Sequence, residues 1–317
     1  MRIVFSKKYT VKDQGHVFRA DKFEAALRRL LAAGLVSRRD VTEPARPSRR
    51  DLELAHTRRW AAKNLRCAFT PADAARAELE LTPAVAGAHL MNVGGTILAA
   101  RHALETGAGL NCGGGAHHAF RGRGGGFCLL NDMAVAIKKL LKEGRIKRAL
   151  VIDLDVHQGD GTAAIFRRDG RVFTFSMHQR GLYPEKKEKS SLDVELPAGT
   201  GDARYLAALK KALPGVIARA RPGLAIYVAG ADVYKGDLLG GLKLTMGGIR
   251  KRDAYVFREC RRSGLPVAVV LGGGYAKKFA DTVRIHAGTL AAAIEAFQGV
   301  PPGTRCRKGR WRKKLFL

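Results

Sequence analysis

The sequence of 317 residues lacks the features of several protein classes. Its five cysteines are scattered, odd in number and never spaced as C-x-x-C, which argues against a disulfide framework and against a zinc–thiolate site. No stretch approaches the roughly 18 consecutive apolar residues that a membrane span needs, and the opening "MRIVFSKKYT" is too short and too charged for a signal peptide. Because 46% of the residues are hydrophobic, we expect a soluble, globular, cytoplasmic protein.

Acidic residues are also scarce, since 28 Asp and Glu face 57 Lys and Arg and leave a net charge of +29. Such a positive field raises the local concentration of polyanions, so contact with nucleic acid or an anionic surface is one interpretation. The basic residues, however, are spread through helix-like segments and gather only in the last stretch, "RCRKGRWRKKLFL". A solvated basic surface explains that distribution equally well, and the sequence contains no zinc finger, aromatic RNA-binding motif or helix-turn-helix.

From about residue 109 to 275 the sequence alternates apolar strand-like runs with helix-like segments, which is typical of βαβ units and a parallel sheet. The strand-like runs are "AGLNCGG", "RALVIDLDV", "RVFTFSMH", "LAIYVAGAD" and "PVAVVLGGGY". The first hundred residues are expected to be mostly helical after a short opening strand. We therefore predict one α/β domain over residues 1–302, followed by a basic tail at residues 303–317.

Each of the five predicted strands ends in polar or ionisable residues. In open parallel sheets, ligands bind beyond the carboxyl ends of the strands, so these residues are the candidates for a site. In chain order they are His117 and His118; Asp153, Asp155 and His157; Ser176 and His178; Asp232; and Tyr275.

The stretch "DLDVHQGDG" predicts a metal site. Asp153, Asp155 and His157 alternate at period two, so they project from one face of an extended segment. Buried carboxylates without a positive partner would cost several kcal/mol. Asp155 and His157, with Asp232 from the fourth predicted strand end, would make a catalytic zinc site with an open position, and Fe²⁺ would accept the same ligands. Taken alone, the stretch could equally be a set of acidic helix caps; its coincidence with "AHHA" and "GGGY" favours the metal.

The tandem histidines His117 and His118 suggest acid–base catalysis beside that metal. A metal lowers the pKa of a water ligand, one imidazole can take the proton, and a second can deliver a proton to a leaving amine. Each imidazole needs a carboxylate to fix its tautomer, and Asp153 and Asp160 are the acids left for that role.

These motifs together resemble those of the histone deacetylase and acetylpolyamine amidohydrolase superfamily. The matching series is "GGGAHHAF…GGGFCLLND", "VIDLDVHQGDGTAAIF", "FSMH", "AGADVYKGDLLGGLKLT" and "LGGGYA", and the resemblance extends over roughly residues 12–298. Gln158 after His157 and the segment "SSLDVELPAGTGD" are most similar to the bacterial and class IV-like branch. The resemblance implies the arginase/deacetylase fold, a single α/β domain with a mostly parallel sheet of about eight strands flanked by helices.

The resemblance also implies roles for individual residues. Asp155, His157 and Asp232 would hold Zn²⁺. His117, oriented by Asp153, would be the general base or the electrostatic partner of the water, and His118, oriented by Asp160, the general acid or base. Tyr275 would donate its hydroxyl to the scissile carbonyl oxygen.

Further positions match the substrate tunnel and a structural cation site of the family. Phe127 would form one wall of an acyl-lysine tunnel, Tyr183 would stand where the family usually has Phe for the other wall, Gly126 would offer its carbonyl to the substrate amide, and Leu239 would line the mouth. A structural K⁺ would be held by Asp153, Asp155, His157 and Ser176. A second such site near Phe166, Asp169 and Val172 has weaker support.

Three departures from the family pattern concern the pocket. Ala116 stands before the tandem histidines where many relatives carry an aromatic residue, and Lys22 replaces an arginine of the acetate-exit cavity, which keeps the charge but loses the bidentate fork. The acidic residue that grips the substrate backbone at the rim in class I enzymes is not identifiable before "NVGGTILAA".

The leading hypothesis is a zinc-dependent amidohydrolase that removes an acetyl or longer acyl group from lysine side chains of proteins or from related amines. An acetylpolyamine or other small-amide amidohydrolase is the closest enzymatic alternative. A second alternative is a module without activity that brings its basic surface to nucleic acid or anionic surfaces. A charge of +29 should repel cationic peptides and polyamines at long range, so the substrate is the least constrained part of the hypothesis.

Overall fold

The computed structural model describes residues 1–11 and 15–298, where eight strands form one sheet. The strand order is β2-β1-β3-β8-β7-β4-β5-β6, and every adjacent pair is parallel. The bounds are β1 Ile3–Val4, β2 Val41–Thr42, β3 Ala108–Asn111, β4 Ala149–Asp153, β5 Val172–Gln179, β6 Leu192–Leu196, β7 Leu224–Val228 and β8 Val267–Val270. The predicted tail at residues 303–317 and the predicted domain end at residue 302 lie outside the described residues.

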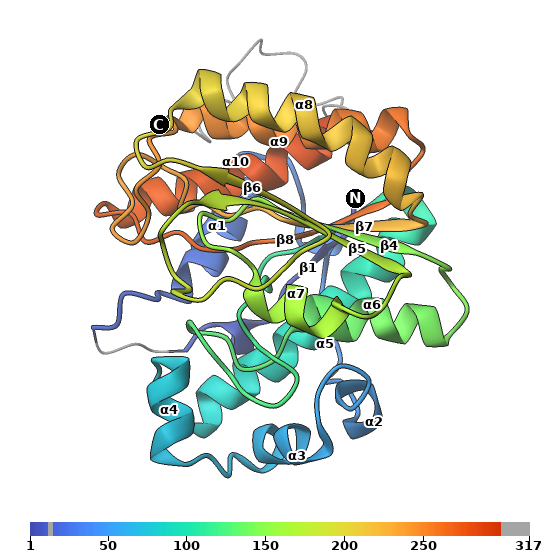
Figure 1. Cartoon of the computed structure of the whole chain (residues 1–317), viewed down its shortest axis with the longest axis vertical. Coiled ribbons are helices and arrows are strands. Elements are labelled where there is room, and N and C mark those ends of the chain that lie inside the picture. The colour runs from blue at the N-terminus through green and yellow to red at the C-terminus, as the bar shows by residue number, and fades with distance from the viewer. Residues whose placement is uncertain (12–14, 299–317) are drawn as a thin grey trace.

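Helices cover both faces of the sheet, with α8, α9 and α10 on one side and α5, α6 and α7 on the other (Figure 1). The helices are α1 Asp21–Ala32, α2 Arg49–Leu52, α3 Arg58–Arg66, α4 Pro71–Ala77, α5 Pro83–Thr106, α6 Asp132–Lys142, α7 Asp160–Phe166, α8 Asp202–Ala220, α9 Met246–Arg262 and α10 Phe279–Gln298. Helix α1 packs against α10. No helix in the described part of the chain combines the length and hydropathy that crossing a bilayer requires.

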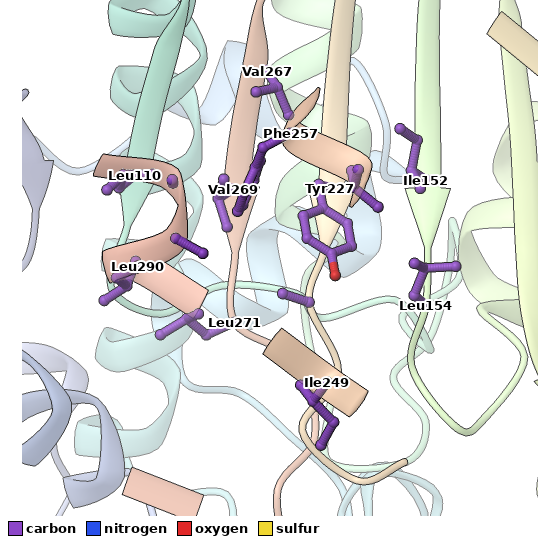
Figure 2. Close-up of a cluster of buried hydrophobic side chains, with 14 of the residues drawn as sticks. Leu110, Ile152, Leu154, Tyr227, Ile249, Phe257, Val267, Val269, Leu271 and Leu290 are labelled. Carbon is purple, nitrogen blue, oxygen red and sulfur yellow. The ribbon is translucent and has the colours of Figure 1, made fainter. Parts of the chain in front are cut away.

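The period-two alternation of the strands divides the hydrophobic core into two layers. Ile152, Tyr227 and Val269 lie opposite one another in register on β4, β7 and β8, and they pack under α9 and α10. Figure 2 shows this layer, in which Phe257 and Ile249 of α9 and Leu290 of α10 lie over the strands. The intervening strand residues, such as Val151, face α5 and α6 instead. Because both faces of the central strands β4, β7 and β8 are buried, the bodies of these strands are continuously apolar and polar groups follow at their carboxyl ends.

Local signals set the ends of the long helices. The Thr82 hydroxyl accepts the backbone N–H of Val85 at 3.2 Å at the start of α5, where Pro83 occupies the first helical position. The same helix ends at Gly107, whose φ of 87° lies in the left-handed region that favours glycine. Asn131 caps α6 in the same way, by accepting the N–H of Ala134 at 2.9 Å.

The predicted parallel α/β sheet is confirmed, and two strands were missing from the prediction. Strand β6 lies at the sheet edge within "SSLDVELPAGTGD", where Asp193 and Glu195 interrupt the apolar run because one side of an edge strand meets solvent. Strand β2 has two residues, which is too short to leave a periodic pattern.

Candidate active site

The carboxyl ends of β3, β4, β7 and β8 meet around one cavity of about 230 Å³. Residues of every predicted functional group line it: His117, His118, Gly126, Phe127, Asp155, His157, Tyr183, Leu239 and Tyr275. Glycines allow the close approach of the loops. A Cβ on Gly273, which has a φ of 54°, would lie 2.1 Å from a carboxylate oxygen of Asp232.

Asp155, His157 and Asp232 form the candidate metal group, since one ligand atom from each lies within 4.8 Å of the others and all three are buried. His157 Nδ1 is 3.1 Å from Asp155 Oδ1 and 3.4 Å from Asp232 Oδ2. Burial alone would lower the pKa of His157, but the two carboxylates outweigh it and raise the pKa to about 10. Asp232 Oδ2 is buried without a hydrogen-bond partner among the described residues. An orphaned carboxylate oxygen beside an imidazole and a second carboxylate fits a divalent cation with the donor preferences of Zn²⁺ or Fe²⁺.

Each catalytic candidate histidine is bound to its predicted carboxylate. His117 Nδ1 lies 2.8 Å from Asp153 Oδ2, and His118 Nδ1 lies 2.6 Å from Asp160 Oδ1. The Nδ1–H of each ring donates to its carboxylate, which turns Nε2 away from that carboxylate. The ring centroids of His117 and His118 are 4.1 Å apart, so both imidazoles face the same small part of the cavity.

The two histidines differ in charge because their surroundings differ. Burial would lower the pKa of His117, but Asp153 and Asp155 outweigh burial and raise the pKa to about 9. Burial, together with the positive charges of His117 and His157, lowers the pKa of His118 well below its usual range. Burial also raises the pKa of Asp160 to about 6. In the metal-free protein at neutral pH the pair therefore consists of one cationic and one neutral imidazole.

Tyr275 is held at the cavity by a carboxylate that sequence reasoning missed. Asp237 Oδ2 accepts the backbone N–H of Tyr275 at 2.7 Å, while Oδ1 accepts those of Leu239 at 2.9 Å and Gly240 at 3.1 Å. One side chain thus joins the loop after β8 to the loop after β7. Burial in the pocket and the nearby carboxylates raise the pKa of the Tyr275 hydroxyl, so it stays protonated as a donor.

The predicted tunnel residues surround the entrance to the cavity. The Phe127 ring packs edge-on against His16 with centroids 5.0 Å apart, and the Tyr183 ring packs edge-on against His118 at 4.9 Å. A Cβ on Gly126 would lie 2.6 Å from the His118 ring and 2.9 Å from the Tyr183 ring, so only glycine fits there. Tyr183 is 39% exposed, which places this ring at the mouth.

Lys22 lies behind the loop that carries Tyr275, and its side chain does not line the cavity. Its ammonium group donates to the carbonyl of Gly273 at 2.5 Å and to that of Gly274 at 3.3 Å, and it lies 4.8 Å from the Tyr275 ring centroid. Burial lowers the pKa of Lys22 to about 8. The lysine therefore fastens the glycine loop from within the core.

Two further residues near the site could not be identified from the sequence. Arg252 of α9 is fully buried, and its guanidinium donates to the carbonyls of Leu154 at 3.2 Å and Gly230 at 2.7 Å, next to the metal group. In the sequence it is part of the basic run "GGIRKRDAYVF", which looks like a solvated helix face. Glu78, an exposed residue at the end of α4, lines the cavity entrance and supplies the acidic group that the sequence did not reveal at the rim.

For the predicted monovalent cation site, the structure pairs Asp153 with Ser176 in register at the ends of β4 and β5. The Ser176 hydroxyl lies 2.9 Å from Nδ1 of His178. At the weaker second position, the Asp169 carboxylate pairs with Arg171 at 2.8 Å. The K⁺ sites therefore stay predictions.

Comparisons with known proteins agree with this fold. Residues 16–290 match the model of the histone deacetylase domain. An uncharacterized protein of Picosynechococcus sp. is 41% identical over 296 residues, which cover 93% of this chain and 99% of that protein. Histone deacetylase 2 of Arabidopsis thaliana is 33% identical over 89% of this chain and 76% of its own length. The acetoin utilization protein AcuC of Bacillus subtilis is 34% identical, over 83% and 73%.

The crystal structure of the HDA15 HD domain superposes with a TM-score of 0.74 over 99% of this chain and 91% of that one, at 23% identity. This likeness shows the fold. A parallel α/β sheet with a candidate metal group and two histidine–carboxylate pairs at its carboxyl edge defines the class as a hydrolytic deacetylase. The chain belongs to the histone deacetylase family, which confirms the resemblance seen in the sequence.

Proposed function

We propose that this protein removes an acetyl or longer acyl group from lysine side chains of proteins or from related amines, with Zn²⁺ as the resident metal and a structural K⁺ nearby. The observation that carries the proposal is the convergence of the metal group and both histidine–carboxylate pairs at the bottom of one aromatic-walled cavity. An entrance flanked by the rings of Phe127 and Tyr183 suits the four methylenes of an acylated lysine, which carries no charge.

The bound metal would act as a Lewis acid and lower the pKa of a water ligand. In our proposal the neutral His118, held by Asp160, accepts a proton from the water and returns it to the leaving amine. His117, held by Asp153, would stabilise the negative charge that develops beside it. The Tyr275 hydroxyl donates to the acyl oxygen.

The remaining residues position the substrate. Phe127 and Tyr183 would enclose the acyl-lysine stem, and the carbonyl of Gly126 would accept the amide N–H. Leu239 would contact the substrate at the mouth. The exposed carboxylate of Glu78 would accept backbone N–H groups of a peptide or attract a cationic amine.

Hydrolysis of an acetyl-lysine peptide by zinc-loaded protein tests the proposal. We expect turnover that a hydroxamate inhibits and that both His118→Ala and Asp155→Ala abolish. The acyl group should be varied from acetyl to long chains, and Zn²⁺ should be compared with Fe²⁺. Absence of turnover on every acyl-lysine and acylpolyamine by metal-loaded protein would refute it.

Glu78 also favours a second candidate, the hydrolysis of acetylated polyamines, because a carboxylate at the entrance attracts a cationic chain. The same assay separates the two: a higher kcat/KM on an acetylated polyamine than on acetyl-lysine peptides, lost on Glu78→Gln, would favour the polyamine. A module without activity is disfavoured by the complete set of paired histidines and metal ligands.

A further inference from the structure

A second hollow, open to solvent and of about 900 Å³, lies on the surface among the end of α4, the loop at residues 120–123 and the end of α7. Five of its nine lining residues are arginines and none is acidic. The lining residues are Arg76, Phe120, Arg121, Gly122, Arg123, Ala164, Ile165, Arg167 and Arg168, and we call this set the arginine hollow.

Acidic groups neutralise little of this charge. Arg167 pairs with Glu188 at 3.5 Å, whereas Arg76, Arg121 and Arg168 form no ion pair within the described part of the chain. The charge of Arg121 also reaches Lys138, whose pKa burial lowers, Asp169 raises and Arg121 lowers. Five exposed like charges in one concavity repel one another, and a bound polyanion would remove that repulsion.

One arginine is held flat against an aromatic ring. The Arg123 guanidinium lies 3.7 Å from the centroid of the Phe120 ring. The carbonyl of Phe120 is fixed in turn by Nδ1 of His56 at 3.0 Å. A planar cation stacked on an aromatic ring can bind phosphate oxygens at its edge and can stack with a base through its face.

The arginine hollow opens beside the mouth of the active-site cavity. An added Cβ on Gly125 would lie 3.5 Å from the Tyr183 hydroxyl and 3.6 Å from Arg123 Nη1, so these two side chains flank one glycine. Burial raises the pKa of Tyr183 to about 12, and the charge of Arg123 partly opposes that rise. A chain bound in the hollow therefore runs next to the entrance.

We propose that the arginine hollow binds the phosphodiester backbone of nucleic acid. Arginine forks match phosphate oxygens, and the Phe120–Arg123 stack suits a nucleotide better than an acidic peptide. A membrane surface fits less well, because the exposed large hydrophobic residues of the described chain are Leu65, Tyr183 and Leu238, and none of these lines the hollow.

One consequence rests on the proposed function: the favoured substrates are acyl-lysines of proteins that are themselves bound to nucleic acid. Free cationic tails are repelled by a chain of charge +29. A phosphate backbone bound in the arginine hollow would make the electrostatic potential beside the tunnel mouth negative, so a cationic tail would be attracted there.

Fluorescence anisotropy of the full-length protein with labelled single- and double-stranded oligonucleotides of one sequence tests the binding. The variant Arg76→Gln/Arg121→Gln/Arg168→Gln should weaken affinity roughly ten- to a hundredfold near 0.15 M salt and reduce the slope of log K against log salt by about three. The matched control is Lys251→Gln/Arg258→Gln/Arg261→Gln, which removes equal charge from the exposed surface of α9 in the opposite layer. That control should keep at least most of the affinity and slope, and thermal unfolding should show both variants folded.

Equal losses in the two triple variants would overturn the proposal, because they would mean that net charge alone drives binding. An undiminished affinity in the hollow variant would also overturn it and assign binding elsewhere. Tighter binding to vesicles of anionic lipid or to polyglutamate than to either oligonucleotide at equal charge would replace nucleic acid with that partner. A preference for the single-stranded oligonucleotide would indicate that a base stacks on the Phe120–Arg123 pair.

A second assay compares an acetyl-lysine peptide joined to an oligonucleotide with the free peptide. We expect a higher kcat/KM for the joined peptide, and the hollow variant should lower the ratio of the two values severalfold. No turnover of either peptide, nor of any other acyl-lysine or acylpolyamine, would refute the proposed function and leave the anisotropy result standing. A ratio of one in unmodified protein that binds the oligonucleotide would refute only the inferred substrate preference.

Discussion

The carboxylate of Asp237 accepts the backbone N–H of Tyr275 at 2.7 Å, across 38 positions of sequence. The same carboxylate binds the N–H of Leu239 at the tunnel mouth. The position of the Tyr275 hydroxyl and the shape of the mouth therefore depend on one half-buried side chain.

We predict that Asp237→Ala lowers kcat by about tenfold to a hundredfold, because a small displacement of a polarising group is costly. If the effect passes through Tyr275, the double variant Asp237→Ala/Tyr275→Phe should be no slower than Tyr275→Phe alone. Additive losses would show that Asp237 acts independently of Tyr275. Asp237→Glu, which keeps the acceptor, should recover part of the rate.

Metal binding should release protons, since the carboxylates of Asp155 and Asp232 raise the pKa of His157 to about 10 in the metal-free protein. At pH 7 to 8 this imidazole carries a proton that the metal must displace, so affinity should rise with pH throughout that window. Titration calorimetry with Zn²⁺ in buffers of different ionisation enthalpy should give a release of about one proton or more. A heat independent of the buffer would contradict the protonated state of His157.

Arg252 should control metal affinity without touching the metal. Its guanidinium donates to the carbonyls of Leu154 and Gly230, which come one residue before Asp155 and two residues before Asp232 in the loops that follow β4 and β7. We expect Arg252→Lys to weaken Zn²⁺ binding by roughly ten- to a hundredfold in competition with a chelating dye, because one ammonium cannot bind Asp253 and also reach both carbonyls, as Nε and Nη1 of arginine do.

The control for that measurement is Thr289→Val. The Thr289 hydroxyl donates to Asp253 at 2.6 Å, and Asp253 accepts from Arg252 at 2.8 Å, so this change disturbs the same buried network away from the carbonyls. It should lower the free energy of unfolding but leave zinc affinity nearly unchanged. Equal losses of affinity in the two variants would assign Arg252 a general structural role.

We predict that the contribution of Lys22 to the free energy of unfolding depends on pH. Burial lowers its pKa from 10.5 to about 8, so the unfolded chain binds more protons than the folded chain between these values. The free energy of unfolding of the wild type, minus that of Lys22→Met, should therefore be lowest below pH 8. This difference should rise by about 3 kcal/mol toward pH 10.5. Chemical denaturation of both metal-free proteins across this range measures it, and a constant difference would show that Lys22 titrates normally.

The fold and most of the site were predictable because their signals are local. Apolar runs followed by "DLDVH" or "GGGAHH" define both a strand and what it carries, and the parallel sheet brings those ends together. Strand β6 was not predicted because an edge strand keeps charged residues, which interrupt the apolar run. The roles assigned to the site residues stay predictions, although the distances between them agree with those roles.

The contacts that support the site were not predicted for a different reason. Arg252 lies 98 positions from Leu154, and Lys22 lies 251 positions from Gly273. Neither contact leaves a sequence pattern, since the sequence does not distinguish a buried arginine or lysine that binds carbonyls from a solvated one. Glu78 likewise looks like one more charge at a helix end until the fold brings it to the tunnel mouth.

The buried guanidinium of Arg252 links the dissociation rate of a bound metal to the opening of the hydrophobic core. Helix α9 cannot separate from the sheet without freeing the ends of both β4 and β7, which the same side chain holds. Loops at an active site usually open at low free-energy cost, but we expect these two to open only when the packed helical layer opens. The dissociation of a bound metal would then be limited by the rate at which that layer opens.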